Sequence, residues 1–423
     1  MNGPGNPADW EDFTYDSIGA PAKGAGSQYT KKLPPSITLT MTGLPIVAEP
    51  GHPVIPLNSD ELLKRSKSIY PVYAFGYNWL QSNKDGAMAL KARILKVISE
   101  NSSASVKCEQ VILVTHSMGG LVARACSDLP DMAKKILGVV HGVMPATGAA
   151  VAYRRCKVGM RDESYAGGLV IGSNGAEVTA VFAQAPGALQ LLPSAEYGLN
   201  WLQLTNPAGK IVASLPKSDP YEEIYLQRNK WWGLIRPEWL APVGGVKLDW
   251  DEFKTNIELA KAFHGSISGK YHHNTFVFYG GGTAKTSFAK IRWEMKKGLQ
   301  PASGTRPGAD QVYQLSHEDL RTDGYNRLYV GGEEEVISGG EFAAPSAIQT
   351  SFFEAFCSTH DGAGDGTVPS GSGAAPRNGG GKSILQQFEL AGIEHEPAYK
   401  KYPVAQAVAY YAITKLASMA VRL

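Results

Sequence analysis

The sequence predicts an α/β fold in which a mostly parallel sheet carries a large insertion. Between residues 69 and 149, short apolar runs alternate with segments of helical periodicity, which indicates strands joined by right-handed crossovers. Beyond residue 149 this alternation stops, and strand patterns return only near residue 274. The chain is therefore predicted to contain an irregular segment 1–68, a first core part 69–149, an inserted cap 150–270 and a second core part 271–423.

The first core part begins with a β-rich run and a helix. The run IYPVYAFGYNW (69–79) is rich in residues that favour strands. Residues 85–101 should form an amphipathic helix, because four apolar side chains recur there at helical spacing: Leu90, Ile94, Val97 and Ile98.

A strand, a helix and a second strand should follow. The uninterrupted apolar run 111–115 is typical of a strand that is covered on both faces. A helix is expected from Met118 to about Asp128, and KILGVVHGV (135–143) has the pattern of another buried strand.

The remaining elements are predicted on either side of the insertion. Residues 150–270 contain many tryptophans and prolines and show no further βα repeat. The runs NTFVFYGGG (274–282) and SILQQFELAGIEH (383–395) predict strands, and VAQAVAYYAITKLASMAV predicts a closing helix. In the N-terminal segment only SITLTMTGL (36–44) has a strand pattern.

The composition argues against several classes of protein. There are 41 Lys and Arg against 39 Asp and Glu, and this balance does not support a nucleic-acid-binding protein. No run of about 18 apolar residues predicts a membrane-spanning helix. The start MNGPGNPADWEDF lacks the features of a secretory signal peptide, so we expect synthesis in the cytoplasm. None of the four cysteines forms a C-x-x-C pair, and neither a metal nor a cofactor is expected.

The stretch VILVTHSMGGLVARACS (111–127) contains the candidate nucleophile, Ser117. A serine on a tight strand-to-helix turn projects its hydroxyl above the sheet, and such a turn needs small neighbours, which Gly119 and Gly120 supply. The helix that begins there directs free N–H groups toward the site. The N–H of Met118 should therefore stabilise the oxyanion of a tetrahedral intermediate.

The residues on either side of this motif need separate interpretation. Thr115 occupies the first position of the pattern G-x-S-x-G, where glycine is usual. His116 adjoins Ser117, but neighbours on a strand point to opposite faces, so packing or loop support is a better interpretation than a base. His141 ends the next predicted strand and could line the pocket.

His395 is the candidate base and Asp365 the candidate acid. In folds with this kind of nucleophile turn, the acid and then the histidine follow the serine along the chain. His395 lies in a loop after the last predicted strand and before the closing helix. Asp365, in the glycine-rich turn GDGTVP, is favoured over Asp361.

Two other features leave alternatives open. The adjacent His272 and His273 could bind zinc, but no third ligand follows at suitable spacing, and two solvated loop histidines are the favoured interpretation. Trp231 and Trp232, in NKWWGLIRPEWLAP, could form a lid that meets lipid or could pack inside the cap.

With these residues in view, the chain resembles lipases of the α/β-hydrolase fold that are related to lecithin:cholesterol acyltransferase. The motifs YAFGYNW, VTHSMGGLVAR, VFYGGGTAKTS, GDGTVP and IEHEPAY follow one another in the order of that group, and the resemblance covers residues 69–423. Within the group, YPVYAFGYNWLQSN and VVHGVMPATGAAVAYRR are similar to antibacterial lipase effectors of bacterial type VI secretion.

This resemblance implies hydrolysis of phospholipid esters, peripheral contact with a membrane, export to the periplasm of a rival cell, and a cognate immunity protein. One departure is the absence of a clear His-Gly or Pro-Gly oxyanion loop before residue 69, where TMTGLP is a poor match. Two alternatives remain: an acyltransferase, which the fold does not separate from a hydrolase, and a catalytically impaired hydrolase-fold binding protein, which only this departure supports.

Overall fold

The computed structural model is divided into two compact units. The first unit comprises Met1–Ala146, Ser266–Lys285 and Gly373–Leu423, and the second comprises Thr147–Gly265 and Thr286–Ser372. The second unit thus contains residues 286–372 as well as most of the predicted cap. The structure describes residues 46–48, 70–104, 107–163, 171–240, 248–297, 312–322, 325–330, 334–337, 346–349, 353–358 and 360–420.

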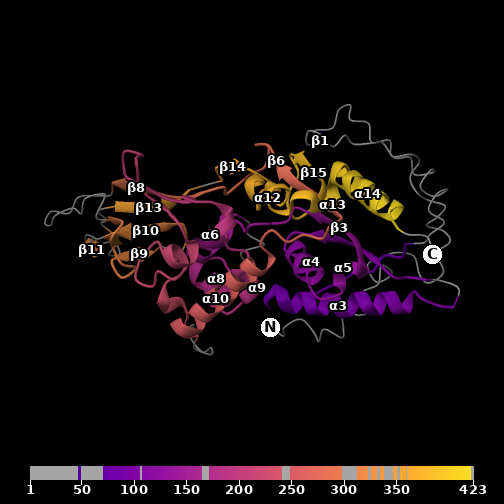
Figure 1. Ribbon diagram of the computed structural model, residues 1–423. Coiled ribbons are helices and arrows are strands. Elements are labelled where there is room, and N and C mark those ends of the chain that lie inside the picture. Colours follow the sequence, from indigo (N-terminus) through magenta and orange to yellow (C-terminus); the bar gives the residue numbers. More distant parts are fainter. Residues whose placement is uncertain are drawn as a thin grey trace. The chain divides into compact units, whose positions relative to one another are not determined.

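The first unit is built on a five-stranded sheet (Figure 1). Its strands, in spatial order, are β1 (Ile46–Ala48), β15 (Ile384–Ala391), β6 (Thr275–Gly281), β3 (Ile136–Gly142) and β2 (Val111–His116). The last four pair in parallel, and β1 pairs antiparallel with β15. The predicted fold class, α/β with a mostly parallel sheet, is confirmed.

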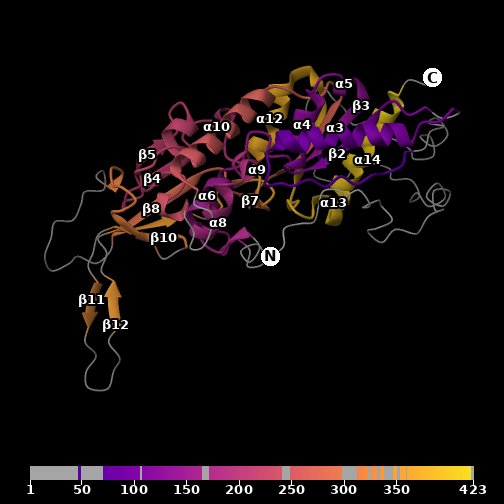
Figure 2. The same ribbon diagram turned by 90° about the horizontal axis from the view of Figure 1, so that it is seen from below.

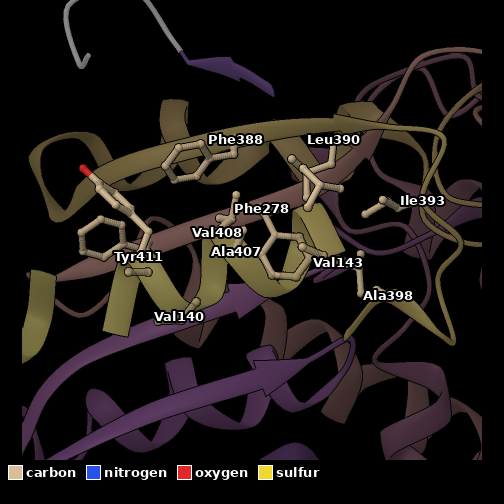
Figure 3. Close-up of a cluster of buried hydrophobic side chains, with 14 of the residues drawn as sticks. Val140, Val143, Phe278, Phe388, Leu390, Ile393, Ala398, Ala407, Val408 and Tyr411 are labelled. Atoms are coloured by element: carbon tan, nitrogen blue, oxygen red, sulfur yellow. The ribbon is translucent and has the colours of Figure 1, made fainter. Parts of the chain in front are cut away.

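Helices cover both faces of this sheet. They are α3 (Asn83–Glu100), α4 (Gly119–Ser127), α5 (Met132–Lys135), α12 (Ser370–Gly380), which begins in the second unit, the short η6 (Gly381–Ser383), α13 (Ala398–Lys401) and α14 (Pro403–Ser418). Val139 of β3 belongs to a buried cluster with α3 and α4, and the adjacent Val140 belongs to the cluster that includes α14 (Figure 3). Because successive strand residues face opposite ways, α14 and the α3–α4 pair cover opposite faces.

Two expectations for this unit are wrong. Residues 70–79 form no regular strand, although Tyr73 lies in an isolated bridge; instead Phe75 and Tyr77 pack against the cluster of α3 and α4. Strand β2 is not covered on both faces, since Val114 is 48% exposed. The reason is its place at one end of the sheet order of the described strands, next to β3. The predicted strand 36–44 lies outside the described residues.

The second unit contains a six-stranded sheet that the sequence pattern does not predict. Its spatial order is β5 (Ile211–Leu215), β4 (Leu202–Thr205), β8 (Ile291–Lys297), β13 (Phe353–Cys357), β10 (Arg327–Val330) and β9 (Leu320–Thr322). Strands β4 and β8 pair in parallel and the other neighbours pair antiparallel. Two shorter ribbons pair β7 (Thr286–Ser287) with β14 (Gly362–Ala363), and β11 (Glu334–Ile337) with β12 (Ser346–Gln349), the latter seen side by side in Figure 2.

The helices of this unit and its aromatic core come largely from the predicted cap. The helices are α6 (Ala150–Val158), α8 (Gly175–Phe182), α9 (Pro186–Leu189) and α10 (Trp250–Ile267, which ends in the first unit), with short turns η3 (Ala195–Tyr197), η4 (Tyr221–Tyr225) and η5 (Pro237–Leu240). Trp231 and Trp232 are only 1% and 3% exposed. Their indole N–H groups donate to backbone carbonyls of Val312 and Tyr313, at 2.8 and 3.0 Å. Of the two interpretations of these tryptophans, the structure therefore supports the packed core.

Within the described ranges, no helix combines the length and the apolar character that crossing a bilayer would require.

Candidate active site

Ser117 stands on a strained turn between β2 and α4. Its φ is +51°, a left-handed conformation that is unfavourable for a residue with a side chain and that is found where structure around the residue enforces it. The Ser117 N–H donates to the carbonyl of Gly142 on β3 at 3.0 Å, so the parallel pairing continues into the turn. The turn has the strand-to-helix geometry that the motif predicts.

The two glycines after Ser117 have different surroundings. A Cβ at Gly120 would lie 2.4 Å from Sδ of Met144 and 3.1 Å from Nδ1 of His141, whereas a Cβ at Gly119 would meet nothing closer than 3.9 Å. Gly120 is therefore the residue that lets the start of α4 approach the end of β3.

Thr115 makes a specific contact at the position where glycine is usual. Its Oγ1 lies 2.9 Å from Nδ1 of His141, whose side chain is only 1% exposed. Burial, together with the charge of Arg124, lowers the pKa of His141 to about 3. His141 is therefore a neutral hydrogen-bonding group beneath the turn and does not act as a titrating residue near neutral pH.

His395 and Ser117 are brought together within the first unit. The Nε2 atom of His395 lies 2.8 Å from Oγ of Ser117, a distance at which a proton can pass between them. His395 comes from the loop between β15 and α13. A serine hydroxyl needs a base within this reach to become a nucleophile.

Met118 is the first residue after the turn and caps α4. Its side chain is buried, and within the described part of the chain its backbone N–H donates no hydrogen bond. An N–H at a helix N-terminus is suited to stabilise an oxyanion. The segment TMTGLP, considered for a second donor, lies outside the described residues.

Asp365 and Asp361 belong to the second unit and differ in their surroundings. Asp365 is 2% exposed, and its Oδ1 accepts from the N–H groups of Thr367 and Val368 at 3.0 and 2.7 Å. Asp361 is exposed, and its Oδ1 accepts from two backbone N–H groups, of Ala289 and Lys290. Asp361 thus caps a surface turn, whereas Asp365 is a buried carboxylate.

A buried serine organises the loop that holds Asp365. Ser287 on β7 accepts from the N–H of Gly366 at 3.0 Å and donates to the carbonyl of Val368 at 3.1 Å. Gly366 has a φ of +94°, which favours glycine. Ser287 carries no sequence signal that distinguishes it from other serines, and only the fold reveals its contacts.

The adjacent histidines, His272 and His273, contact each other and the surrounding structure. His272 is buried, its Nε2 lies 3.1 Å from the carbonyl oxygen of Ala133, and its ring lies 4.1 Å from that of His273. The expectation of two solvated histidines is therefore wrong for His272, whose pKa is lowered chiefly by burial. Across the described ranges, no group of three His, Cys, Asp or Glu side chains is placed to hold a metal ion.

Sequence reasoning missed two residues around the site. Tyr399, within the motif IEHEPAY, donates from its hydroxyl to the carbonyl of Thr115 at 2.9 Å. Arg124 on α4 donates to the carbonyls of Ala146, Ile267 and Lys270. An arginine within the apolar run LVARAC is the one signal that could have indicated a buried ionic group.

Comparisons with known proteins identify the family of the chain. The family described as "PGAP1-like alpha/beta domain" matches residues 74–156. No curated protein matches the sequence significantly. Among solved structures, a chain of the Tle4–Tli4 complex is similar to this one with a TM-score of 0.65 and 30% sequence identity, over 89% of this chain and 74% of that chain. The chain therefore belongs to the α/β-hydrolase family of type VI lipase effectors that the Tle4–Tli4 complex represents.

Proposed function

We propose that this lipase effector is a serine hydrolase that cleaves carboxylic esters of membrane phospholipids through an acyl-enzyme. The observation that supports this most directly is the 2.8 Å separation of His395 Nε2 from Ser117 Oγ on a turn with positive φ. A serine that served only in a turn would not require a loop 278 residues away to present an imidazole to its hydroxyl.

The proposed reaction proceeds in two halves. Ser117 Oγ attacks the ester carbonyl carbon as His395 Nε2 takes the hydroxyl proton, and the carbonyl electron pair moves to the oxygen, which the Met118 N–H stabilises. The intermediate collapses, the ester C–O bond breaks, and His395 returns the proton to the leaving alcohol. Water then repeats the sequence at the acyl carbon and releases the fatty acid and free Ser117.

Asp365 is the proposed acid that orients His395. Its position between Ser117 and His395 in the chain follows the order serine, acid, histidine. Its carboxylate is buried, and two backbone N–H groups of its own loop fix its position, as an orienting acid requires. Asp361 is exposed and engaged in a turn, and it is the weaker candidate.

Chemical labelling and lipid hydrolysis test the serine mechanism together. A fluorophosphonate probe should modify Ser117, and vesicles of phosphatidylethanolamine and phosphatidylglycerol should release fatty acid. Ser117→Ala should abolish both, and His395→Ala should lower the hydrolytic rate on the order of 10⁶-fold, as in another serine hydrolase. Wild type that folds but leaves the probe unreacted would overturn the serine mechanism. Transfer of the acyl group to an added alcohol, with no free fatty acid, would instead show an acyltransferase.

We propose further that the enzyme acts in the periplasm of a target cell and is neutralised in its producer by an immunity protein. The similar structure is a complex of two proteins, which supports a partner of this kind. Expression with an added signal peptide should be toxic to a bacterial host, and Ser117→Ala should remove the toxicity. Harmless periplasmic accumulation of folded, probe-reactive enzyme would contradict this site of action.

A further inference from the structure

Three consecutive residues at the end of β2 each contact the loop that carries His395. The carbonyl of Thr115 accepts from the Tyr399 hydroxyl at 2.9 Å, His116 Nε2 lies 2.8 Å from the carbonyl oxygen of His395, and Ser117 Oγ lies 2.8 Å from His395 Nε2. The strand end therefore engages both the side chain and the backbone of His395. The contact made by His116 is the one that reaches the backbone of this residue.

The chemistry of the His116 contact fixes its direction. A backbone carbonyl only accepts hydrogen bonds, so Nε2 of His116 must carry a hydrogen and donate it. The His395 carbonyl also accepts from the N–H of Ala398, but at the longer distance of 3.4 Å. The imidazole of His116 thus makes the shorter of these two hydrogen bonds to the carbonyl.

The strand geometry explains why His116 can make this contact while Ser117 faces the substrate. Alternation along β2 directs His116 away from the direction of Ser117, toward the loop after β15. Its ring centre lies 5.2 Å from that of His395 and 6.2 Å from that of Tyr399. His116 is therefore well placed to hold the loop from beneath and poorly placed to act on the ester itself.

We propose that His116 is a positioning residue for the catalytic base, acting through the backbone carbonyl of His395. This inference rests on the proposed function, since it concerns the base of that reaction. Only two rotatable bonds join the imidazole of His395 to its Cα, so a displacement of the backbone also moves Nε2 away from Ser117 Oγ. Proton transfer requires the 2.8 Å approach, and a misplacement of about 1 Å can cost about 100-fold in rate.

Two amide variants separate hydrogen bonding from ring packing. In His116→Gln the side-chain amide reaches about as far as Nε2 of the imidazole and can still donate to the carbonyl. In His116→Asn the same amide is one methylene shorter and cannot reach it. Both variants lose the ring, so a difference between them reports the hydrogen bond alone.

The turnover of a short soluble ester should distinguish these variants. His116→Asn should lower kcat by about 100-fold with KM within about twofold, and His116→Gln should recover most of the loss. Thermal melting confirms that both are folded. Equal losses in the two variants would assign the effect to ring packing, and unchanged kcat in both would remove any role in catalysis; either result overturns the proposal.

Hydrogen–deuterium exchange of residues 392–401 tests the loop independently of catalysis. In His116→Asn this peptide should exchange about 10-fold faster, since one partly buried hydrogen bond is lost, while His116→Gln should resemble wild type. Unchanged exchange in both variants would overturn the anchoring. If wild type does not react with the fluorophosphonate probe, the proposed function fails, and the exchange data then decide whether His116 holds the loop.

Discussion

The loop of His395 and the loop of Asp365 are held in different ways. In the first unit, the His395 loop is held by groups of β2: the imidazole of His116, and the carbonyl of Thr115, which accepts from the Tyr399 hydroxyl. In the second unit, Asp365 itself accepts two N–H bonds from its own loop, and Ser287 on β7 joins two further points of the same turn. Asp365 is therefore part of the structure that positions it, whereas His395 is positioned by others.

The largest effect is expected when each of the two candidate acids, Asp365 and Asp361, is replaced by asparagine. Asp365→Asn should lower kcat by about 10⁴-fold, since an amide cannot stabilise the imidazolium, and the loss in a related triad is of this size. The asparagine oxygen can still accept from Thr367 and Val368, so the fold should survive. Asp361→Asn keeps its acceptor as well and should change kcat by less than about threefold.

Ester hydrolysis by the two purified variants, with melting temperatures as the folding control, gives the answer. A damaging Asp361→Asn beside a harmless Asp365→Asn would reverse the assignment of the acid.

Removing the Ser287 hydroxyl should show how far the Asp365 loop depends on its two hydrogen bonds to β7. Ser287→Ala leaves the Val368 carbonyl and the Gly366 N–H without this partner in a buried site, at a cost of about 2–4 kcal/mol in the free energy of unfolding. The adjacent Thr286→Ala, on the same strand but half-buried, is the matched control and should cost less than about 1 kcal/mol. Urea titration measures both.

A loss of activity in Ser287→Ala that exceeds its loss of stability would indicate that the loop, once loosened, misplaces Asp365. Equal small effects in both variants would show that Ser287 does not organise the loop.

The sequence predicts well the elements that depend on local patterns, and it misses the features that depend on residues distant in the chain. The periodicities of α3 and α14 and the apolar runs of β3 and β6 lie within single segments, and each element formed as expected. Strand β4 has only four residues, and its parallel partner β8 lies 89 residues further along the chain. No local sequence pattern therefore predicts the six-stranded sheet.

The site shows the same limit. The motif around Ser117 indicated the turn, and strand alternation indicated that His116 points away from Ser117. Neither could show that the imidazole meets a carbonyl 279 residues away.

The buried His141 provides a pH test of the nucleophile region. Its pKa is about 3 in the folded protein and 6.5 when unperturbed, so between these values the unfolded chain binds a proton that the folded one does not. Stability is therefore lost as the pH falls below about 6.5, by about 2 kcal/mol from this residue between pH 7 and pH 5. His141→Gln should reduce this loss.

The free energy of unfolding of wild type and of His141→Gln, measured in urea at pH 7 and at pH 5, tests this prediction. Equal losses in wild type and His141→Gln would mean that His141 takes up its proton in the folded state within this range.

The smallest effects are expected at the two glycines after Ser117. A methyl group at Gly120 would overlap Met144 and press on His141, so Gly120→Ala should cost about 1–3 kcal/mol by overpacking. Gly119 has room for a methyl group and lies in the first turn of α4, so Gly119→Ala should be neutral or should stabilise by up to about 1 kcal/mol.

Melting temperatures of the two variants test this contrast directly, since the substitutions are chemically identical and one residue apart. Destabilisation by Gly119→Ala equal to that by Gly120→Ala would mean that the turn itself, rather than the approach of α4 to β3, requires both glycines. Tolerance at Gly120 would instead mean that Met144 can move aside, and the rigid contact beneath Ser117 would then lie with Thr115 and His141.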